Sequence, residues 1–298
     1  GPIAPLFRFV GAAVNNGVVP MSGNLPQAKG NAESLPLTFE STGLRLKLYF
    51  TVFGGVLTRR TVLENISEKP LWIRKLHSFC MDLPGRFDMT TFDGGWIAEM
   101  HKHTVPVADS RVVNESTTGF SSYRHNPGFL LSEPGATEDS GWVYGFNLIY
   151  SGNHYASAQR SLQGFTRVMQ GISPDNFRWE LLPGQSFETP EAVLAVSDQG
   201  FGGVSQRMHK FVLEHIIPVY WKYRERPVLY NDWEGCMFDF SGRKLLNLAK
   251  QAKELGCELF VLDDGWFGER NDDTAGLGDY HVNKKKLPQG IKGLSERI

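Results

Sequence analysis

Two adjacent aspartates, Asp263 and Asp264, directly follow a short apolar run in this chain. The run, residues 259–262, is uncharged and mostly β-prone, which predicts a strand buried on both faces of a parallel sheet. The aspartates then lie at the carboxyl end of that strand, where α/β folds bind their ligands. Ionised carboxylates are strong hydrogen-bond acceptors and suit the vicinal hydroxyl donors of a sugar. We therefore predict that Asp263 and Asp264 bind substrate.

The same two aspartates also have a structural interpretation. One would cap the turn that follows the strand, and the other would pair with a cation such as Arg270. Two tryptophans extend the functional interpretation, because Trp233 and Trp266 could form flat apolar walls beside the carboxylates. Core filling is the alternative for both rings.

Other residue patterns favour structure over chemistry. The run 271–273, Asn-Asp-Asp, lacks the spacing of a calcium loop and is typical of a solvated turn. His101 and His103 alternate as zinc ligands might, but no third ligand is near in sequence, so we predict no metal site. The polar segment 121–127 suits a ligand-facing loop and a structural turn equally well. The sequence holds no nucleophile elbow, phosphate loop or dinucleotide fingerprint, and we expect no cofactor.

A strand, a helix and a second strand position the aspartates. Residues 226–234 predict a strand that ends in polar groups, and residues 241–255 predict an amphipathic helix with Ser241 or Asp239 at its start and Gly256 at its end. Residues 257–264 supply the second strand. This order predicts a right-handed βαβ unit with parallel strands, and residues 287–298 indicate entry into another helix.

The preceding part of the chain predicts an antiparallel β sandwich. Residues 44–52 alternate, with Leu44, Leu46, Leu48, Phe50 and Val52 on the face expected to be buried. Similar short β segments are predicted at residues 57–63, 71–79, 142–150, 177–182 and 192–196. We expect no long helix between residues 35 and 197. Residues 204–217 suit a linker helix that Pro218 terminates.

Composition excludes several classes of partner. Lys and Arg number 31 against 32 Asp and Glu, so the net charge of -1 favours neither nucleic acid nor an anionic membrane. No segment reaches the roughly 20 consecutive apolar residues of a membrane span. The three cysteines, Cys80, Cys236 and Cys257, are far apart and have apolar neighbours, which predicts buried free thiols in a reducing compartment, the cytoplasm.

Four groups of residues together resemble the glycoside hydrolase family 36 α-galactosidases. They are 121–127 with Glu138-Asp139, 143–146 and 150–153; Gly171-Ile172 with 179–181, Pro183-Gly184 and 189–191; 226–229 with Asn231, Trp233-Glu234 and 238–240; and 258–273 with 277–279. The resemblance extends from about Gly23 to Ile298.

The resemblance implies a fold, a site and an activity. The implied fold is mixed β and α/β: a large antiparallel β-supersandwich (1–200), a linker helix (201–225) and the first βαβ unit of a (β/α)8 catalytic barrel (226–298). Asp263, Asp264 and Trp233 match positions that bind the terminal galactose of an α-galactoside oligosaccharide of the raffinose or melibiose type. The family hydrolyses with retention, and its nucleophile and acid/base are expected beyond residue 298, so this chain would hold no catalytic residue. A homotetramer is also implied.

Two other functions stay open at this point. A member of the family that has lost catalysis would bind galactosides without cutting them. A galactosyl transferase of the same family would pass the sugar to another acceptor. The residues that would distinguish hydrolysis from transfer are the acceptor subsites, and the sequence does not identify them.

Overall fold

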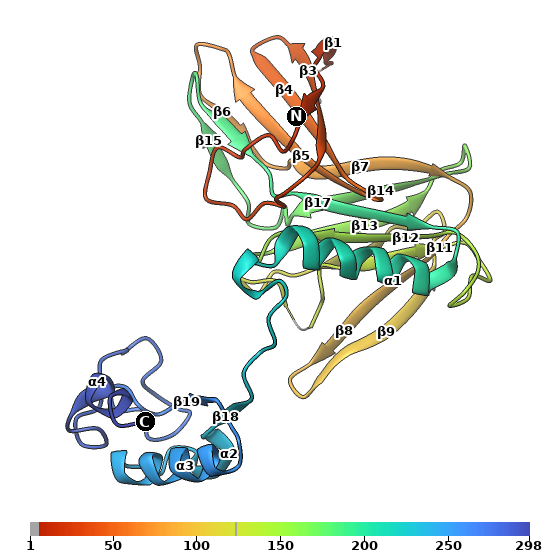
Figure 1. Ribbon diagram of the computed structural model, residues 1–298. Coiled ribbons are helices and arrows are strands. Elements are labelled where there is room, and N and C mark those ends of the chain that lie inside the picture. Colours follow the sequence, from red (N-terminus) through yellow and green to blue (C-terminus); the bar gives the residue numbers. More distant parts are fainter. Residues whose placement is uncertain (1–5, 123) are drawn as a thin grey trace. The chain divides into compact units, whose positions relative to one another are not determined.

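The computed structural model describes residues 6–122 and 124–298. The chain divides into two compact units, Gly1–Pro218 and Val219–Ile298. Within the described residues the first unit is built mostly of antiparallel strands, and the second contains a parallel strand pair with helices (Figure 1). The predicted fold class, mixed β and α/β, is confirmed.

One large antiparallel sheet dominates the first unit. Its main path runs β1-β3-β4-β5-β17-β12-β11-β8-β9, with β2 added to β3 and β16 added to β5. The strands are β1 (Arg8–Ala12), β2 (Asn15–Asn16), β3 (Glu33–Ser41), β4 (Leu44–Phe53), β5 (Val56–Asn65), β8 (Asp88–Gly95), β9 (Ala98–Pro106), β11 (Phe129–Ser132), β12 (Val143–Leu148), β16 (Ser186–Glu188) and β17 (Ala192–Ser197).

A four-stranded antiparallel sheet, in the order β10-β13-β14-β7, completes the sandwich. It consists of β10 (Val112–Glu115), β13 (His154–Arg160), β14 (Phe165–Ile172) and β7 (His77–Pro84). A small pair joins β15 (Trp179–Leu181) to β6 (Leu71–Ile73). The apolar segment 71–79 is therefore two strands, because its halves pair with different partners and join different sheets.

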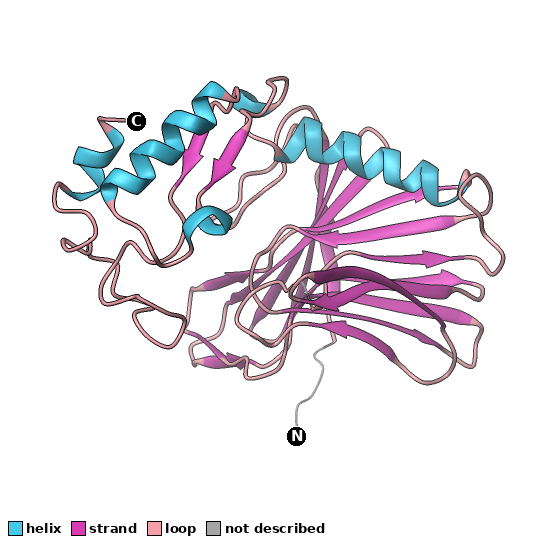
Figure 2. Cartoon of the chain, turned by 90° about the horizontal axis from the view of Figure 1, so that it is seen from below, coloured by secondary structure: helices cyan, strands magenta, loops and turns pink. Residues whose placement is uncertain are grey.

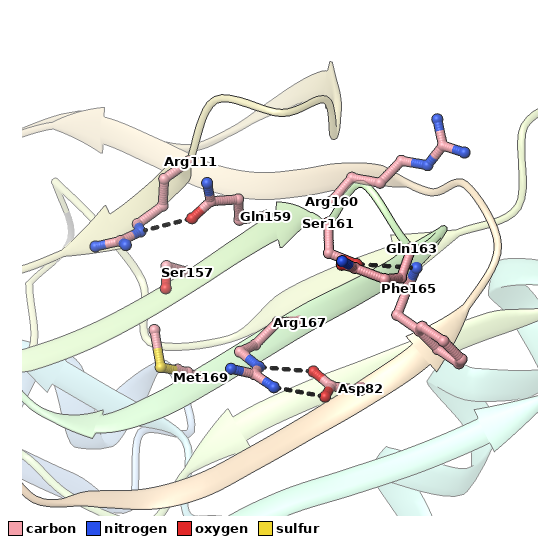
Figure 3. A pocket seen from close by; sticks show the side chains of 10 residues that line it. All are labelled: Asp82, Arg111, Ser157, Gln159, Arg160, Ser161, Gln163, Phe165, Arg167 and Met169. Carbon is pink, nitrogen blue, oxygen red and sulfur yellow. Dashed lines mark hydrogen bonds and ion pairs between the residues drawn. The ribbon is translucent and has the colours of Figure 1, made fainter. Parts of the chain in front are cut away.

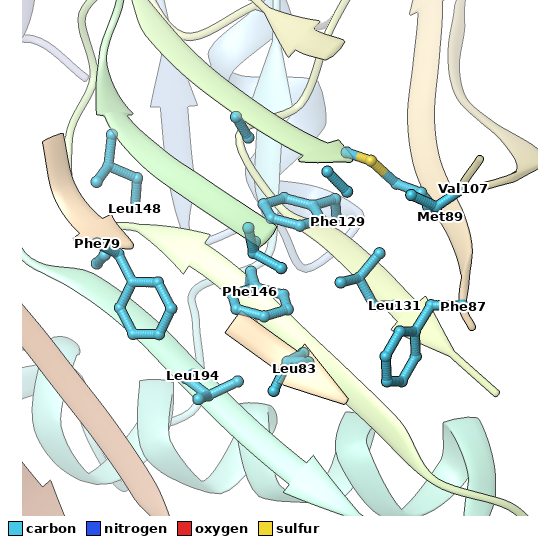
Figure 4. Close-up of a cluster of buried hydrophobic side chains, with 14 residues drawn as sticks. Phe79, Leu83, Phe87, Met89, Val107, Phe129, Leu131, Phe146, Leu148 and Leu194 are labelled. Atoms are coloured by element: carbon cyan, nitrogen blue, oxygen red, sulfur yellow. The ribbon is translucent and has the colours of Figure 1, made fainter. Parts of the chain in front are cut away.

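The main core lies between the two sheets (Figure 4). Phe79 of the four-stranded sheet meets Phe146 of the large sheet edge-on, with ring centroids 5.8 Å apart, and Phe146 stacks on Phe129 at 4.7 Å. Each such buried ring contributes roughly 1.5–3 kcal/mol relative to an exposed one. The predicted antiparallel sandwich thus rests on inward-facing alternate residues of both sheets.

Strand β4 forms as predicted, but at its end the opposite face is buried. Thr51 and Phe53 are 2% and 3% exposed, whereas Val52 is 45% exposed. Phe53 is buried because Phe211 packs edge-on against its ring at 5.5 Å. The rest of the leucine-rich face of β4 is only half-buried. The prediction that this face forms the core was therefore wrong at the end of the strand.

A helix follows the last sandwich strand and packs on the large sheet. Helix α1 (Gly200–Phe211) continues as a π-helical turn, η1 (Val212–Ile216), and lies against β17 and β12 (Figure 2). Val204 and Phe211 are its buried apolar residues. The chain becomes extended at Ile217, just before Pro218, as the sequence predicted. No described residue between 35 and 197 is helical.

The second unit contains the predicted βαβ arrangement. It comprises η2 (Val219–Trp221), β18 (Leu229–Asn231), α2 (Trp233–Cys236), α3 (Gly242–Glu254), β19 (Leu259–Val261) and α4 (Gly290–Ser295). Ser241 caps α3 by accepting a hydrogen bond from the Lys244 amide, and Gly256 follows the helix with a φ of +91° that suits glycine. Leu245, together with Leu287 and Leu294, forms the centre of this unit's core.

Candidate functional site

The two parallel strands bring their polar ends together. Asn231 of β18 lies opposite Val261 of β19, so the residues that follow both strands emerge at the same edge. The Asn231 side-chain amide donates to Asp263 Oδ2 over 2.5 Å. Its carbonyl oxygen accepts from the Trp233 backbone N–H at 2.8 Å. Asn231 therefore connects two of the three predicted site residues.

Asp232 holds the main chain of the site. It is only 1% exposed, and its Oδ1 accepts from the backbone N–H of Asp263 at 2.7 Å. Its Oδ2 accepts from the Cys236 thiol at 3.3 Å. Burial raises the pKa of that thiol to about 11, so Cys236 stays protonated and remains a donor. Asp232 was not predicted as a site residue, because nothing in the strand pattern separates it from the polar residues beside it.

The Asp263 carboxylate is oriented but only half-buried. Besides the bond from Asn231 to its Oδ2, its Oδ1 accepts from the Asp264 backbone N–H at 2.7 Å. Each oxygen keeps a lone pair for another donor, since a carboxylate has about four acceptor positions. Asp263 is thus a fixed acceptor that can bind a hydroxyl group.

Asp264 is paired with Arg270. Arg270 donates through Nε to Oδ1 at 2.9 Å and through Nη2 to Oδ2 at 2.7 Å, and Gly265 N–H also donates to Oδ1. The hydrogen bonds from Arg270 are the largest cause of a lowered pKa for the Asp264 carboxyl group. The structural interpretation, in which one aspartate pairs with Arg270, therefore describes Asp264. The ion pair keeps this carboxylate ionised beside Asp263.

Lys286 supports the turn behind the aspartates. Its ammonium group donates to the carbonyl oxygens of Phe238, Gly265 and Arg270 at 2.9, 2.9 and 3.2 Å. Burial is the main cause of the lowered pKa of Lys286. In the sequence this residue is the third of three consecutive lysines, and that run carries no signal that one of them turns inward.

Trp233 begins the one-turn helix α2 beside the strand ends. Its ring is half-buried and meets Phe238 edge-on, with centroids 5.0 Å apart. Arg270 lies over Phe238 as well, at 5.5 Å from its centroid. Phe238 therefore supports both the tryptophan and the cation that holds Asp264. Trp266 packs in the core of the unit and meets Phe267 edge-on.

The other candidate residues form no ligand cluster in the described part of the chain. Asp272 accepts from the Thr274 N–H at 2.9 Å and from its hydroxyl, as a turn residue does. His101 and His103 are exposed on β9. No group of three or more His, Cys, Asp or Glu side chains among the described residues is placed to hold a metal.

The described cysteines include one that is exposed. Cys236 is buried, Cys257 is partly buried and Cys80 is exposed; all three are free thiols. Cys80 is exposed because its neighbour Phe79 faces the core, and alternation along β7 directs Cys80 outward. The prediction of buried thiols was therefore wrong for Cys80.

The segment 121–127 is anchored by side chains from the sandwich, and one of its residues, Tyr123, lies outside the described residues. Three buried side chains of the four-stranded sheet hold three successive carbonyl oxygens of this segment. His154 bonds to the carbonyl of His125, Asn114 donates to that of Asn126, and Gln170 donates to that of Pro127, at distances of 2.8, 2.8 and 3.1 Å. These bonds favour the structural-turn interpretation.

The chain thus joins a β sandwich to a βαβ unit that has carboxylates at its strand ends. Residues 1–182 match the glycosyl hydrolase family 36 N-terminal domain, and residues 186–298 match the melibiase family. The chain belongs to glycosyl hydrolase family 36. The match includes the first 22 residues, contrary to the expectation that it begins near Gly23.

Several proteins of this family are similar to the chain. Alpha-galactosidase AgaA of Geobacillus stearothermophilus is 41% identical over 259 residues, which cover 86% of this chain and 36% of AgaA. Alpha-galactosidase Mel36A of Lactobacillus acidophilus is 38% identical over 272 residues, 90% of this chain and 37% of Mel36A. The chain thus spans little more than a third of the length of these relatives.

Solved structures agree with this chain over its whole length. The crystal structure of AgaA has a TM-score of 0.95 at 38% identity and covers 100% of this chain, which corresponds to 42% of that structure. The structure of a substituted AgaA in complex with raffinose has the same TM-score at 37% identity. It covers 100% of this chain, which corresponds to 42% of that structure. Among the described residues, none of the helices is long and apolar enough to cross a membrane.

Proposed function

We propose that this chain supplies the galactose-binding part of a retaining exo-α-galactosidase that acts on oligosaccharides of the raffinose or melibiose type. Asp263, Asp264 and Trp233 would contact the terminal galactose. One observation carries the proposal: the parallel strands β18 and β19 end side by side, and Asn231 at the end of one donates a hydrogen bond to Asp263 after the other. Further support comes from the family, in which forms of AgaA have been solved with raffinose and with stachyose.

The chemistry of the three residues suits a pyranose. Asp263 is a half-exposed acceptor whose direction is set by Asn231 and by the Asp264 backbone N–H. Asp264 stays ionised at neutral pH because Arg270 lowers its pKa, so this carboxylate accepts hydrogen bonds and donates none. The ring of Trp233 supplies a flat apolar surface for the C–H face of the sugar.

Neither aspartate is proposed to break the glycosidic bond. A retaining glycosidase needs two carboxyl groups about 5–5.5 Å apart on either side of that bond. Asp263 and Asp264 follow one another after a single strand, and Asp264 already lies in the turn that follows it. Arg270 also occupies both oxygens of Asp264. We infer that this chain alone binds the sugar without hydrolysing its glycosidic bond.

Two measurements on the purified chain test the proposal. Isothermal titration with galactose should show binding to the chain, and Asp263→Ala should weaken that binding at least tenfold. Glu269→Ala, which changes an exposed residue nearby, is the matched control and should leave the binding unchanged. Release of p-nitrophenol from its α-galactoside should stay at the uncatalysed rate. If Asp263→Ala left galactose binding unchanged, the proposed site would be disproved. Clear release of p-nitrophenol would disprove only the inference that this chain alone does not hydrolyse the bond.

Two broader parts of the proposal are a homotetrameric assembly, which the family resemblance supports, and a cytoplasmic location. Free thiols at Cys80, Cys236 and Cys257 suit a reducing compartment. Sedimentation analysis of the whole protein would measure the subunit number directly.

A further inference from the structure

The outward face of the four-stranded sheet carries a hollow lined mainly by polar side chains. Ala156 and Val168 point into the core, so alternate residues of β13 and β14 point away from it. The register places Gln159, Arg167 and Asp82 side by side across β13, β14 and β7. These three residues help to line a hollow of about 510 Å³ (Figure 3). Sites for small ligands typically have volumes of about 300–1,000 Å³.

Positive charge predominates in the lining of this hollow. Three of the lining residues are arginines, Arg111, Arg160 and Arg167, whereas Asp82 is the one carboxylate among the described residues that line it. Three positive charges less one negative charge leave the lining with a formal charge of +2, although the whole chain carries -1. A concave surface with one excess sign of charge attracts ligands of the opposite sign, so the hollow favours an anion.

One of the three arginines is paired within the hollow. Arg167 donates through Nε and Nη2 to the two oxygens of Asp82, both at 2.7 Å. These two side chains are 59% and 42% exposed, so a ligand can reach them from solvent. Arg111 and Arg160 form no ion pair with a carboxylate in the described part of the chain. Figure 3 shows the guanidinium group of Arg160 turned away from the other lining side chains, so Arg160 adds charge and Arg111 is the unpaired contact group.

The arginines keep unused hydrogen-bond donors, whereas the acceptors beside them are occupied. Gln159 donates to the carbonyl oxygen of Asp109 at 2.8 Å and accepts from Arg111 Nε at 3.4 Å. Both oxygens of Asp82 accept from Arg167. The two Nη groups of Arg111 and Nη1 of Arg167 have no hydrogen-bond partner among the described residues. A ligand rich in acceptor oxygens therefore complements these groups.

The spacing of the two arginines suits a phosphate group. Arg111 and Arg167 lie on opposite sides of Gln159, with β13 between their backbones. Neighbouring strands are about 4.8 Å apart, so these backbones are separated by roughly 10 Å, and two long side chains can reach one ligand between them. A guanidinium group matches both carboxylate and phosphate oxygens. A phosphate group has three acceptor oxygens and a larger charge, so it can accept from two arginines at once.

We propose that this hollow binds a small molecule that carries a phosphate group. Arg111 and Arg167 donate to the phosphate oxygens. The ring of Phe165, which is 46% exposed in the lining, packs on the organic part of the ligand. The site belongs to the first unit, and it does not depend on the function proposed for the strand ends of β18 and β19.

Titration of the 298-residue chain with phenyl phosphate at low ionic strength tests this site. Binding is expected with a Kd on the order of 1 mM or tighter, and added salt should weaken it because the arginines are exposed. Arg111→Gln and, separately, Arg167→Gln should weaken binding at least tenfold. Phe165→Ala should weaken binding of phenyl phosphate and leave that of inorganic phosphate unchanged. Arg74→Gln, which removes an exposed arginine outside this hollow, is the control for the change of charge and should have no effect.

Four results would overturn the proposal. They are the absence of phenyl phosphate binding, equal binding of uncharged benzyl alcohol, equal weakening by Arg111→Gln and Arg74→Gln, and full-strength binding of phenyl phosphate by Phe165→Ala. The third result would show that the overall charge of the chain attracts the anion. Circular dichroism and thermal unfolding verify that each variant is folded. If Arg167→Gln does not fold, Arg111→Gln decides the question, because Arg111 contacts only Gln159 among the described side chains.

Discussion

At the level of single residues, three side chains orient the two carboxylates of the proposed galactose site. Asp232 fixes the backbone N–H of Asp263, Asn231 fixes its carboxylate, and Arg270 fixes the neighbouring carboxylate of Asp264. Hydrogen bonds that involve a charged group are roughly twice as strong as neutral ones. The two acceptors are therefore oriented before any ligand arrives, which lowers the cost of binding.

The pairing of Asp264 with Arg270 predicts a specific pH dependence. Arg270→Met should lower stability at neutral pH, because Asp264 then loses the donors that lower its pKa. The ion pair contributes its whole stabilisation at pH values above the pKa of Asp264 in the unfolded chain, about 3.9. The contribution is lost as the pH falls through the lower pKa of Asp264 in the folded chain. Urea unfolding of both proteins between pH 2.5 and 7 should show a difference that disappears at the acid end.

An exposed ion pair provides the control for this measurement. Lys285 and Glu269 are 83% and 76% exposed and lie 3.7 Å apart. Lys285→Met should change stability little at any pH, because solvent screens such pairs. A difference between wild type and Arg270→Met that grows below pH 4 would contradict the assignment of the ion pair.

At the level of elements, the irregular pairing of β7 with β14 holds a partly buried histidine. The register shifts between Gln170 and Gly171, and His77 lies opposite Gly171 with its ring stacked on Tyr155 at 5.3 Å. Neither ring nitrogen of His77 has a hydrogen-bond partner among the described residues. Burial is the main cause that lowers the pKa of His77 to about 4, and the charge of Lys75 adds to it.

This histidine should make the sandwich sensitive to mild acid. Below the unfolded-state pKa of 6.5 the unfolded chain binds a proton that the folded chain excludes, so stability falls between pH 6.5 and about 4. The loss should reach on the order of 3 kcal/mol, since one pKa unit corresponds to about 1.4 kcal/mol. His77→Phe, which keeps the stacked ring, should remove this contribution. Equal slopes for both proteins in unfolding measured across this pH range would refute it.

At the level of the whole molecule, each unit has its own core. The clusters around Phe146 and Phe53 lie within the first unit, and the cluster around Leu245 lies within the second. The second unit pairs only two strands among its described residues, and Leu229 and Leu259 on those strands are 51% and 43% exposed. A pair of strands is marginal alone and depends on the helices that pack on it.

The units should therefore differ in stability. Residues 1–218, expressed alone, should unfold cooperatively in urea with a midpoint close to that of the major transition of the full chain. Residues 219–298, expressed alone, should unfold at a lower urea concentration, because less apolar surface is buried per residue in a small domain. Circular dichroism follows both transitions. A higher urea midpoint for residues 219–298 than for residues 1–218 would contradict this prediction. It would show that the exposed Leu229 and Leu259 reduce the stability of the second unit little.

Local sequence patterns determined the elements and the edge on which the site lies. Alternation predicted strand β4, the i, i+3, i+4 pattern with Ser241 and Gly256 predicted helix α3, and polar residues after two apolar runs placed Asp263 beside the end of β18. These features depend on near neighbours in the chain and on the rule that parallel strands end at the same edge. The sequence therefore specified which polar residues lie together at this edge.

Only the tertiary structure decided which partner each side chain meets. The aromatic Phe53 is buried because Phe211, far along the chain, packs on it. Lys286 turns inward because three carbonyl oxygens converge on it, and Cys80 is exposed because its neighbour faces the core. Asp264 carries no local signal of an ionic partner, yet Arg270 lies within hydrogen-bonding distance of it. Such partners depend on how distant segments pack, and no local pattern of residue types records that packing.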